Sequence, residues 1–298
     1  MYEKSDKFNS ILTAYAQGAY QNPDEDVDLM ATFFPAIQVG THVGEYDIRA
    51  ISPGYTAVDA KLTRDNTPRR ISANVTKGYY NCTPKAIEIA SWVPALRQDN
   101  GDQIREDNLR TLMSAQFTTR QKEAADLVLT TTAASGLNGA ISSNANADVV
   151  GMLETLCRNV VEGTGRRPSH LVMGHAAWNI IRNHPRIVDR ISGLAYGTAT
   201  DALLSMLSYG GITPVIVDSM HMQEGTLKPL LSDQVIALYN DPAPSRTDLS
   251  FGKEFTLNPA GPEVLSYTEH AVNEVDLLMW SGHSVIANPA ALSRIAVS

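Results

Sequence analysis

The sequence predicts an α+β protein organised around one long helix, and three patterns carry this prediction. Residues 107–131 contain neither Gly nor Pro and keep an apolar period close to 3.6, which is typical of a helix. Residues 42–83 instead alternate apolar and polar side chains with a period of two, as strands do. After residue 147, helical and strand patterns alternate, which is typical of an α/β unit. We therefore expect a long helix that joins a hairpin to an α/β unit.

The long helix is expected to begin at Asp107 or Asn108, because both residue types accept hydrogen bonds at helix starts, and to end at residues 131–136. At about 1.5 Å per residue it would span roughly 37 Å. Its apolar stripe is expected to consist of Leu109, Leu112, Met113, Phe117, Arg120, Ala124, Leu127 and Val128.

Residues 1–41 predict an N-terminal arm with a short amphipathic helix, in which Phe8, Ile11, Leu12 and Tyr15 share one face. The apolar residues 29–35 need a partner surface, which could belong to this subunit's own core or to a neighbour. We expect that a single subunit does not provide partner surfaces for both this arm and the hairpin.

The hairpin is expected to have strands near residues 46–50 and 71–76, separated by a polar stretch rich in turn residues. It has no apolar face large enough to fold alone, so it must pack on something else. In an enzyme such a hairpin would be a lid, and in an assembly it would be an arm that reaches another chain.

The remainder of the chain predicts a series of shorter elements. Residues 84–99 form a strand or a first helical turn, and a linker of small residues follows the long helix at 135–146. Helices are expected at 147–165, at 175–191 with an interruption at His184-Pro185, and at 201–208. Residues 221–224 are interpreted as a turn. Strands are expected at 169–174, 212–218, 230–239, 251–257, 264–268, 275–279 and 291–297.

Composition and charge exclude several classes of protein. The chain has a net charge of −8, which argues against a protein whose whole surface grips nucleic acid, since phosphate contacts need clustered Lys and Arg; a small basic patch stays open. Its two cysteines, Cys82 and Cys157, are too few for a disulfide framework and are expected to be buried thiols. No leader precedes residue 30 and no run of about 18 apolar residues occurs, so neither secretion nor a membrane span is expected.

Motifs for catalysis and cofactor binding are also missing. Gly163-Thr164-Gly165 follows a helix and lacks the third glycine of a dinucleotide-binding turn, and Gly252-Lys253 lacks the Ser or Thr of a phosphate loop. The chain contains neither a Gly-x-Ser-x-Gly elbow nor a His-Glu-x-x-His zinc motif. We therefore predict no catalytic residues, no cofactor and no metal.

The order of the parts resembles the major capsid protein of tailed bacteriophages, the Hong Kong 97-type fold. Ser169-His170-Leu171-Val172-Met173-Gly174-His175-Ala176-Ala177-Trp178, followed by Asn183-His184-Pro185-Arg186-Ile187, looks like the passage from strand to helix that opens the axial domain in many such coats. The resemblance implies an N-terminal arm (1–41), an extended loop (42–83), a peripheral domain with the long spine helix (84–146 and 262–298) and an axial domain (147–261).

The resemblance also implies a function. The chain would be a structural protein without enzyme activity that assembles in the host cytoplasm into the icosahedral shell of a virion. Its partners would be many copies of itself, as hexamers and pentamers, a portal, optional scaffolding or cement proteins, and double-stranded DNA enclosed without specific binding. Two alternatives stay open: an encapsulin-like bacterial compartment, and an α/β hydrolase or transferase whose lid is the hairpin.

Two oppositely charged segments are the candidate contacts between subunits. The hairpin tip has a local charge of +3, and the approach to the long helix has a local charge of −3. In the resembled fold the extended loop lies over the peripheral domain of the adjoining subunit, so we expect the two segments to meet between chains. The contacting residues would be Lys61, Arg64, Arg69 and Arg70 on the hairpin, and Asp99, Asp102, Glu106 and Asp107 near the helix.

Overall fold

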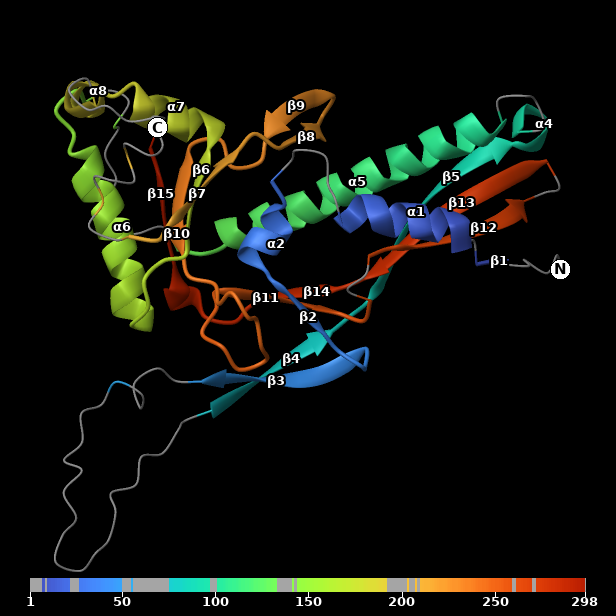
Figure 1. Ribbon diagram of the computed structural model, residues 1–298, viewed down its shortest axis with the longest axis horizontal. Coiled ribbons are helices and arrows are strands. Elements are labelled where there is room, and N and C mark those ends of the chain that lie inside the picture. Colours follow the sequence, from blue (N-terminus) through green and yellow to red (C-terminus); the bar gives the residue numbers. More distant parts are fainter. Residues whose placement is uncertain are drawn as a thin grey trace, which may run out of the picture.

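The structure is a computed structural model that describes residues 7–8, 10–21, 27–49, 55, 75–96, 101–132, 141, 144–191, 203, 207, 210–258, 261–269 and 272–297. Two four-stranded sheets lie near opposite ends of one long helix, as Figure 1 shows. A three-stranded sheet and the base of a hairpin lie between them. The α+β class predicted from the sequence is confirmed.

The first four-stranded sheet has the strand order β15-β10-β6-β7. Strand β10 is antiparallel to both of its neighbours, whereas β6 and β7 are parallel, as expected for strands joined by a helical crossover. The elements of this unit are β6 (His170–Gly174), β7 (Thr213–Val217), β10 (Gln234–Leu238), β15 (Leu292–Ala296), α6 (Val149–Thr164), α7 (His175–Arg182) and α8 (Pro185–Ile191). The strands predicted at 169–174, 212–218, 230–239 and 291–297 and the helices predicted at 147–165 and 175–191 are therefore confirmed.

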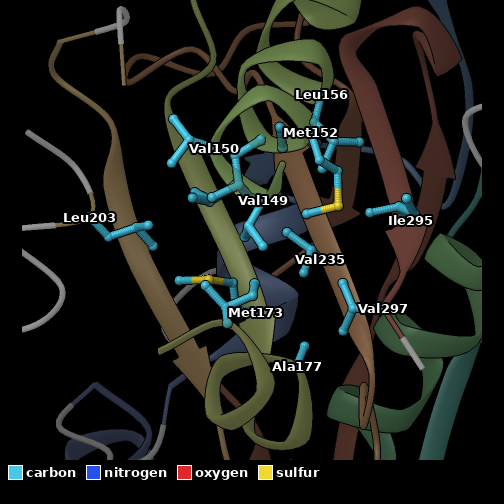
Figure 2. Packing of buried hydrophobic residues seen from close by; sticks show 14 of the residues in the cluster. Val149, Val150, Met152, Leu156, Met173, Ala177, Leu203, Val235, Ile295 and Val297 are labelled. Atoms are coloured by element: carbon cyan, nitrogen blue, oxygen red, sulfur yellow. The ribbon is translucent and has the colours of Figure 1, made fainter. Parts of the chain in front are cut away.

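Both faces of this sheet are buried. In β6, Leu171 and Met173 pack against the cluster that α6 and α7 contribute to (Figure 2). Val172 points to the opposite face and packs against Phe33 of the N-terminal arm and Val128 of the long helix. Because neither face meets water, the strands have continuous apolar runs rather than alternating patterns.

Helix boundaries in this unit follow from local chemistry. Pro185 begins α8, because proline lacks the N–H needed to continue α7 but suits the first turn of a new helix. Gly165 ends α6 in the left-handed conformation, with φ of 68°, and its N–H donates to the carbonyl of Val161 at 2.7 Å. The Gly-Thr-Gly motif is therefore a helix end. Of the helix expected at 201–208, only Leu203 and Leu207 lie among the described residues, and both are buried.

The long helix α5 (Gly101–Leu129) begins six residues before the predicted Asp107, so the predicted start is wrong. Its extra turns are held by tertiary contacts, since Arg105 pairs with Glu274 of the neighbouring sheet at 2.9 Å. Most of the predicted stripe is buried, although Met113, Phe117 and Leu127 are only half-buried. The sequence missed the buried members Gln116, Gln121 and Ala125.

The second four-stranded sheet has the order β1-β12-β13-β5 and is covered by helices on one face. Val264 and Leu278 of this sheet pack against Leu109 and Leu112 of α5 and against Ala16 of α1. Its elements are β1 (Lys7–Phe8), α1 (Ser10–Gln21), β5 (Pro84–Trp92), α4 (Val93–Leu96), β12 (Glu263–Glu269) and β13 (Asn273–Ser281). Residues 84–99 thus begin as a strand, one of the two structures expected for them.

A third sheet, β14-β11-β2, lies between the two larger ones. Its strands are β2 (Ala36–Gln38), β11 (Gly252–Thr256) and β14 (His283–Ile286), and a short 3-10 helix, η2 (Pro289–Ala291), precedes β15. All of residues 262–298 were expected to belong to the same domain as the long helix. This assignment is wrong for the last strand. Strand β15 pairs with β10, and Ile295 completes the core of the first unit.

The N-terminal arm is anchored by α2 (Leu29–Phe33). Met30, Phe33 and Phe34 are fully buried in the same subunit, which decides between the two partner surfaces left open by the sequence. The expectation that the arm lacks a partner within its own subunit is therefore wrong. Gln121 of α5 fixes the arm's entry, since its Oε1 accepts from the N–H of Leu29 at 2.9 Å and its Nε2 donates to Val27 at 3.0 Å.

A hairpin occupies the region where the sequence was interpreted as a turn. Strands β8 (Met220–Gln223) and β9 (Thr226–Pro229) are joined by Glu224 and Gly225, both with positive φ. This is the backbone combination that two-residue hairpin loops favour. The strands are short and exposed on both faces, so they lack the alternation that predicts a strand from sequence.

Cys82 and Cys157 are buried and free, as predicted. Burial raises the pKa of the Cys157 thiol to about 11. No helix within the described ranges is long and apolar enough to cross a membrane.

Candidate assembly surfaces

The base of the extended hairpin is formed by β3 (Val43–Arg49) and β4 (Val75–Asn81), which pair antiparallel. Residues 50 and 71–74 of the predicted strands lie outside the described residues. Tyr46 lies across Gly78 of the opposite strand, and Tyr80 lies across Gly44. A Cβ at either glycine would come within 2.3 Å of the facing tyrosine, so the two rings occupy space that only glycine leaves open.

Both tyrosines pack on one phenylalanine of the central sheet. The ring centroids of Tyr80 and Phe255 are 4.5 Å apart in a stacked arrangement, and those of Tyr46 and Phe255 are 5.1 Å apart. Aromatic pairs at these distances stabilise by about 0.5–1.5 kcal/mol beyond the area that they bury. The expectation that the hairpin lacks a partner within its own subunit is therefore wrong for the hairpin base.

A histidine fixes the end of β4. The backbone N–H of Asn81 donates to Nδ1 of His283 at 3.0 Å, which requires that this ring nitrogen carry no proton. Burial lowers the pKa of His283 below its usual value of 6.5, and the nearby Lys85 cation lowers it further. The neutral ring is thus favoured by its environment.

The outer face of the hairpin base is open. Val43 and Tyr79 are 63% and 66% exposed. Farther along the two strands Lys77 lies near both Glu45 and Asp47, with its Nζ 2.7 Å from Asp47. This face combines apolar side chains with two carboxylates and one ammonium group. Exposed tyrosine is enriched where proteins contact one another, whereas charged side chains belong to the polar rim of such contacts.

A second open surface lies on the one-sided sheet. Alternate residues of β5, from Pro84 to Trp92, are exposed, while Ile87 and Ile89 face α5. Trp92 is 60% exposed at the outer end of the strand, beside Val272, which is 49% exposed. Large apolar side chains that gather at the surface mark interaction sites rather than ordinary surface.

The central strand β11 is fully buried and carries two charged residues. Glu254 pairs with Arg120 of α5 at 2.7 Å, and Lys253 pairs with Asp248 at 2.8 Å; all four side chains are buried. Burial raises the pKa of the Glu254 carboxyl, and the Arg120 guanidinium opposes that rise. A cavity of only about 30 Å³ adjoins the Arg120–Glu254 pair, which is room for about one water molecule. These buried charges are therefore structural.

A further pair of titratable groups lies at the surface. His175 and Asp218 lie 2.5 Å apart where the parallel strands β6 and β7 end, but both side chains are more than half exposed. Within the described ranges, no group of three His, Cys, Asp or Glu side chains is arranged to hold a metal ion.

The two charged segments expected to meet between subunits are only partly visible. Lys61, Arg64, Arg69, Arg70 and Asp99 lie outside the described residues. The other three acids, Asp102, Glu106 and Asp107, lie exposed on the first two turns of α5.

Two of these three acids already have partners within the chain. Arg105 bridges Asp102 and Glu274, and Arg110 pairs with Glu106 at 2.8 Å. The carboxylates here are Asp102, Glu106, Asp107 and Glu274, and the guanidinium groups are Arg105 and Arg110. Four negative and two positive charges leave a local charge of −2. This end of the helix therefore stays acidic.

Sequence reasoning missed the two tyrosine–glycine pairs and Trp92. A signal for the first existed, because Gly44 and Gly78 interrupt strands that are otherwise well patterned. Trp92 has no comparable signal, because its exposure depends on which face of β5 the helix covers.

Comparison with known proteins identifies the architecture. No family model matches the chain, and no curated protein matches it in sequence. Among solved structures, it is similar to a phage-related protein from Bordetella bronchiseptica RB50, with 16% identity, a TM-score of 0.72 and 98% of each chain covered. It is also similar to the capsid of cyanophage P-SCSP1u, with 9% identity, a TM-score of 0.58, and 90% of this chain and 86% of the other covered. The chain has the Hong Kong 97-type capsid fold.

The capsid fold is not confined to phage structures. The chain is also similar to an encapsulin complex from Synechococcus elongatus PCC 7942, with 11% identity, a TM-score of 0.52 and 94% of each chain covered. At these identities the similarity establishes the fold, and the function has to be argued from the surfaces.

Proposed function

We propose that the chain is the major capsid protein of a tailed bacteriophage, which self-assembles into the icosahedral shell around a double-stranded DNA genome. The observation that carries this proposal is the capsid fold over nearly the whole chain. The fold is accompanied by the paired strands β3 and β4, the base of the hairpin that we expect to reach another subunit.

The open surfaces support self-assembly. The outer face of the hairpin base and the open face of the second sheet expose apolar side chains that a lone subunit leaves in water. These two surfaces differ from one another, so contacts made through them join unlike patches and continue from copy to copy. Closed rings of such copies, as hexamers and pentamers, would build a shell.

The chain's charge supports a shell that encloses DNA without binding it specifically. The 24 Lys and Arg side chains are outnumbered by 32 Asp and Glu, and this net charge of −8 disfavours phosphate contacts, each of which would add salt-dependent affinity that resists packaging. A portal and scaffolding or cement proteins would be separate partners. Assembly would take place in the host cytoplasm before the shell becomes part of the virion.

Electron microscopy of the purified protein tests the proposal. We expect hollow, closed particles of uniform size, formed by the chain alone or with a scaffold supplied in trans. A monomer that stays stable at every concentration, with or without a scaffold, would overturn it.

The encapsulin-like compartment is the second candidate, favoured by the similarity to the Synechococcus complex over 94% of each chain. The two candidates differ in what the shell contains. Particles isolated from the native source should hold double-stranded DNA if the chain is a capsid protein, and a folded protein cargo if it is a compartment shell.

The charged segments give a finer proposal for the contact between subunits. The basic hairpin tip of one subunit would lie on the acidic end of α5 in the next. One exposed pair contributes only about 0–1 kcal/mol, but repeated pairs set register and association rate. Reversing Arg69 and Arg70 to Glu should impair assembly, and adding Asp102→Lys with Glu106→Lys should partly restore it.

A reversal elsewhere on the surface serves as the control. Glu162 lies on α6 and its side chain is 70% exposed, so Glu162→Lys should not restore assembly. Normal assembly of the Arg69→Glu/Arg70→Glu variant, or a failure of the acidic reversals to restore anything, would exclude the pairing.

A further inference from the structure

A cavity of about 210 Å³ opens at the start of β5, close to the base of the hairpin. Its wall combines the apolar side chains of Pro84, Leu257, Met279 and Trp280 with the polar ones of His42, Asn258, Glu263 and Ser281. Apolar cavities of about 150 Å³ are large enough to bind benzene. This cavity therefore has room for a larger aromatic group.

The chemistry of the wall suits an indole. The sulfur of Met279 can make a favourable contact with an aromatic ring. Glu263 accepts a hydrogen bond from Asn258 at 3.2 Å, and its carboxylate has further lone pairs for an indole N–H. A buried tryptophan usually needs such an acceptor.

The chain carries an exposed indole at the other end of the same strand. Pro84, on the cavity wall, and Trp92 lie on the same exposed face of β5. Eight residues of extended strand separate them, which is about 27 Å. Trp92 therefore cannot reach the cavity of its own subunit.

We propose that Trp92 of one copy inserts into this cavity of a second copy of the chain. The inserted indole would be an anchor of the kind that dominates interface energetics, where tryptophan is enriched. Val272, exposed beside Trp92, would pack at the rim. The inference rests on the proposed self-assembly and names one of its contacts.

The contact is directional, because the indole and the cavity lie at different places on the subunit. Each copy offers one indole and one cavity, so the contact repeats from copy to copy and either closes into a ring or continues. The two ends of β5, with β4 before one and α4 after the other in Figure 1, would thus meet different neighbours in the shell.

Substitution of the indole is the first test. Because Trp92 is exposed, Trp92→Ala should leave the melting temperature of the dissociated subunit unchanged, while the protein concentration needed for assembly should rise at least tenfold. Trp92→Phe, which keeps one aromatic ring, should raise the concentration needed for assembly by a smaller factor. Assembly of Trp92→Ala at the parent concentration would overturn the inference.

Crosslinking tests the proximity directly. One chain carries Trp92→Cys and a second, mass-tagged chain carries Ser281→Cys, on the cavity wall. The first chain keeps an unchanged cavity, and the second chain keeps Trp92. The two native cysteines are buried. After mixed assembly, a short bis-maleimide should join the two chains. The matched pair of Val188→Cys, an exposed position on α8, with Ser281→Cys should give less than a tenth of that yield.

The outcomes separate the inference from the proposed function. Particles that form without a crosslink from position 92 would overturn the inference and leave the shell function standing. Failure of the parent chain to form particles would remove the proposed function itself. A crosslink from Tyr79→Cys in place of Trp92→Cys would show a different occupant and would also overturn the inference.

Discussion

The two four-stranded sheets differ in how many of their faces the subunit covers. In β6 of the first sheet, Leu171, Val172 and Met173 are all fully buried, because helices lie on one face and the arm and α5 on the other. In β5 of the second sheet, every other residue is exposed, because α5 and α1 cover only one face. The first sheet is complete within the subunit, and the second offers a surface that other copies can cover.

The long helix α5 packs on both sheets. Its first half, through Leu109 and Leu112, packs on the one-sided sheet, and its second half, through Ala124 and Val128, packs on the two-sided one. The buried pair of Arg120 and Glu254 lies between the two halves. The helix and this buried pair therefore join the two sheets within the subunit.

The largest expected effect comes from breaking that junction. Arg120→Met leaves the Glu254 carboxylate buried without its cation, and such changes cost about 3–5 kcal/mol. Replacing both residues with Met should recover most of the loss, because neither charge of this pair is then left buried without its partner. Urea unfolding of the dissociated subunit, followed by circular dichroism, measures both variants.

The control for this prediction is the exposed pair of Lys122 and Asp126, two residues along the same helix. Lys122→Met should change the unfolding free energy by only about 0–1 kcal/mol. Equal losses for the single and double substitutions of Arg120 and Glu254 would contradict the account.

Alanine substitutions on the two sheets should separate stability from assembly. Leu171→Ala in the two-sided sheet should lower the unfolding free energy by about 2–5 kcal/mol, because it leaves a cavity in a closed core. Leu277→Ala, half-buried on the open face of the other sheet, should cost less than about 1 kcal/mol in the subunit. We expect Leu277→Ala to impair particle formation instead, as sedimentation would show; equal losses of subunit stability would remove the distinction.

The base of the hairpin, β3 and β4, is likewise covered by the subunit on one face only. Gly78→Ala would place a Cβ within 2.3 Å of the Tyr46 ring and should destabilise the base by about 1–3 kcal/mol through overpacking. Gly40→Ala is the matched control, since nothing lies within 4 Å of its Cβ position. Hydrogen exchange of β3 and β4 should accelerate in the first variant only, and unchanged exchange would argue against the tyrosine–glycine packing.

The smallest expected effect is a local response to pH. The pKa of His283 is lowered in the folded chain, so the neutral ring contributes fully above its usual value of 6.5, and this contribution falls as pH drops below that value. Protonation of the ring would also break the hydrogen bond that it accepts from the Asn81 N–H. The charged groups near the ring are the Lys85 cation and the Glu254 carboxylate, which lies next to Gly282.

Hydrogen exchange at Asn81, corrected for the intrinsic rate, should therefore speed up between pH 7 and pH 5.5. His283→Gln keeps an acceptor without titrating, so it should remove this dependence. The same pH response in His283→Gln would assign it to another group.

Much of the first unit was predictable because its signals are local. The buried strand at 170–174, the proline that separates α7 from α8, and the glycine that ends α6 each follow from residues within one or two turns of the chain. Periodicity also predicted most of the buried stripe of α5, including the unexpected position of Arg120.

The missed features depend on partners far along the chain. The helix start at Gly101 depends on Glu274, and the buried state of Arg120 depends on Glu254, and neither partner is encoded near its contact. The pairing of β15 with β10 likewise depends on topology rather than pattern. Exposure of Trp92 follows only from the register of β5 and the face that α5 covers, so the candidate assembly surface could not be read from the sequence.

Oxidative footprinting of dissociated and assembled protein tests most directly whether other copies complete the one-sided sheet. Hydroxyl radicals modify exposed side chains, so Trp92, Leu277 and Met279 should be labelled in the dissociated subunit and protected severalfold in particles. Met173, buried between the first sheet and its helices, should remain unlabelled in both states. Particles in which Trp92, Leu277 and Met279 are labelled as strongly as in the dissociated subunit would contradict the account.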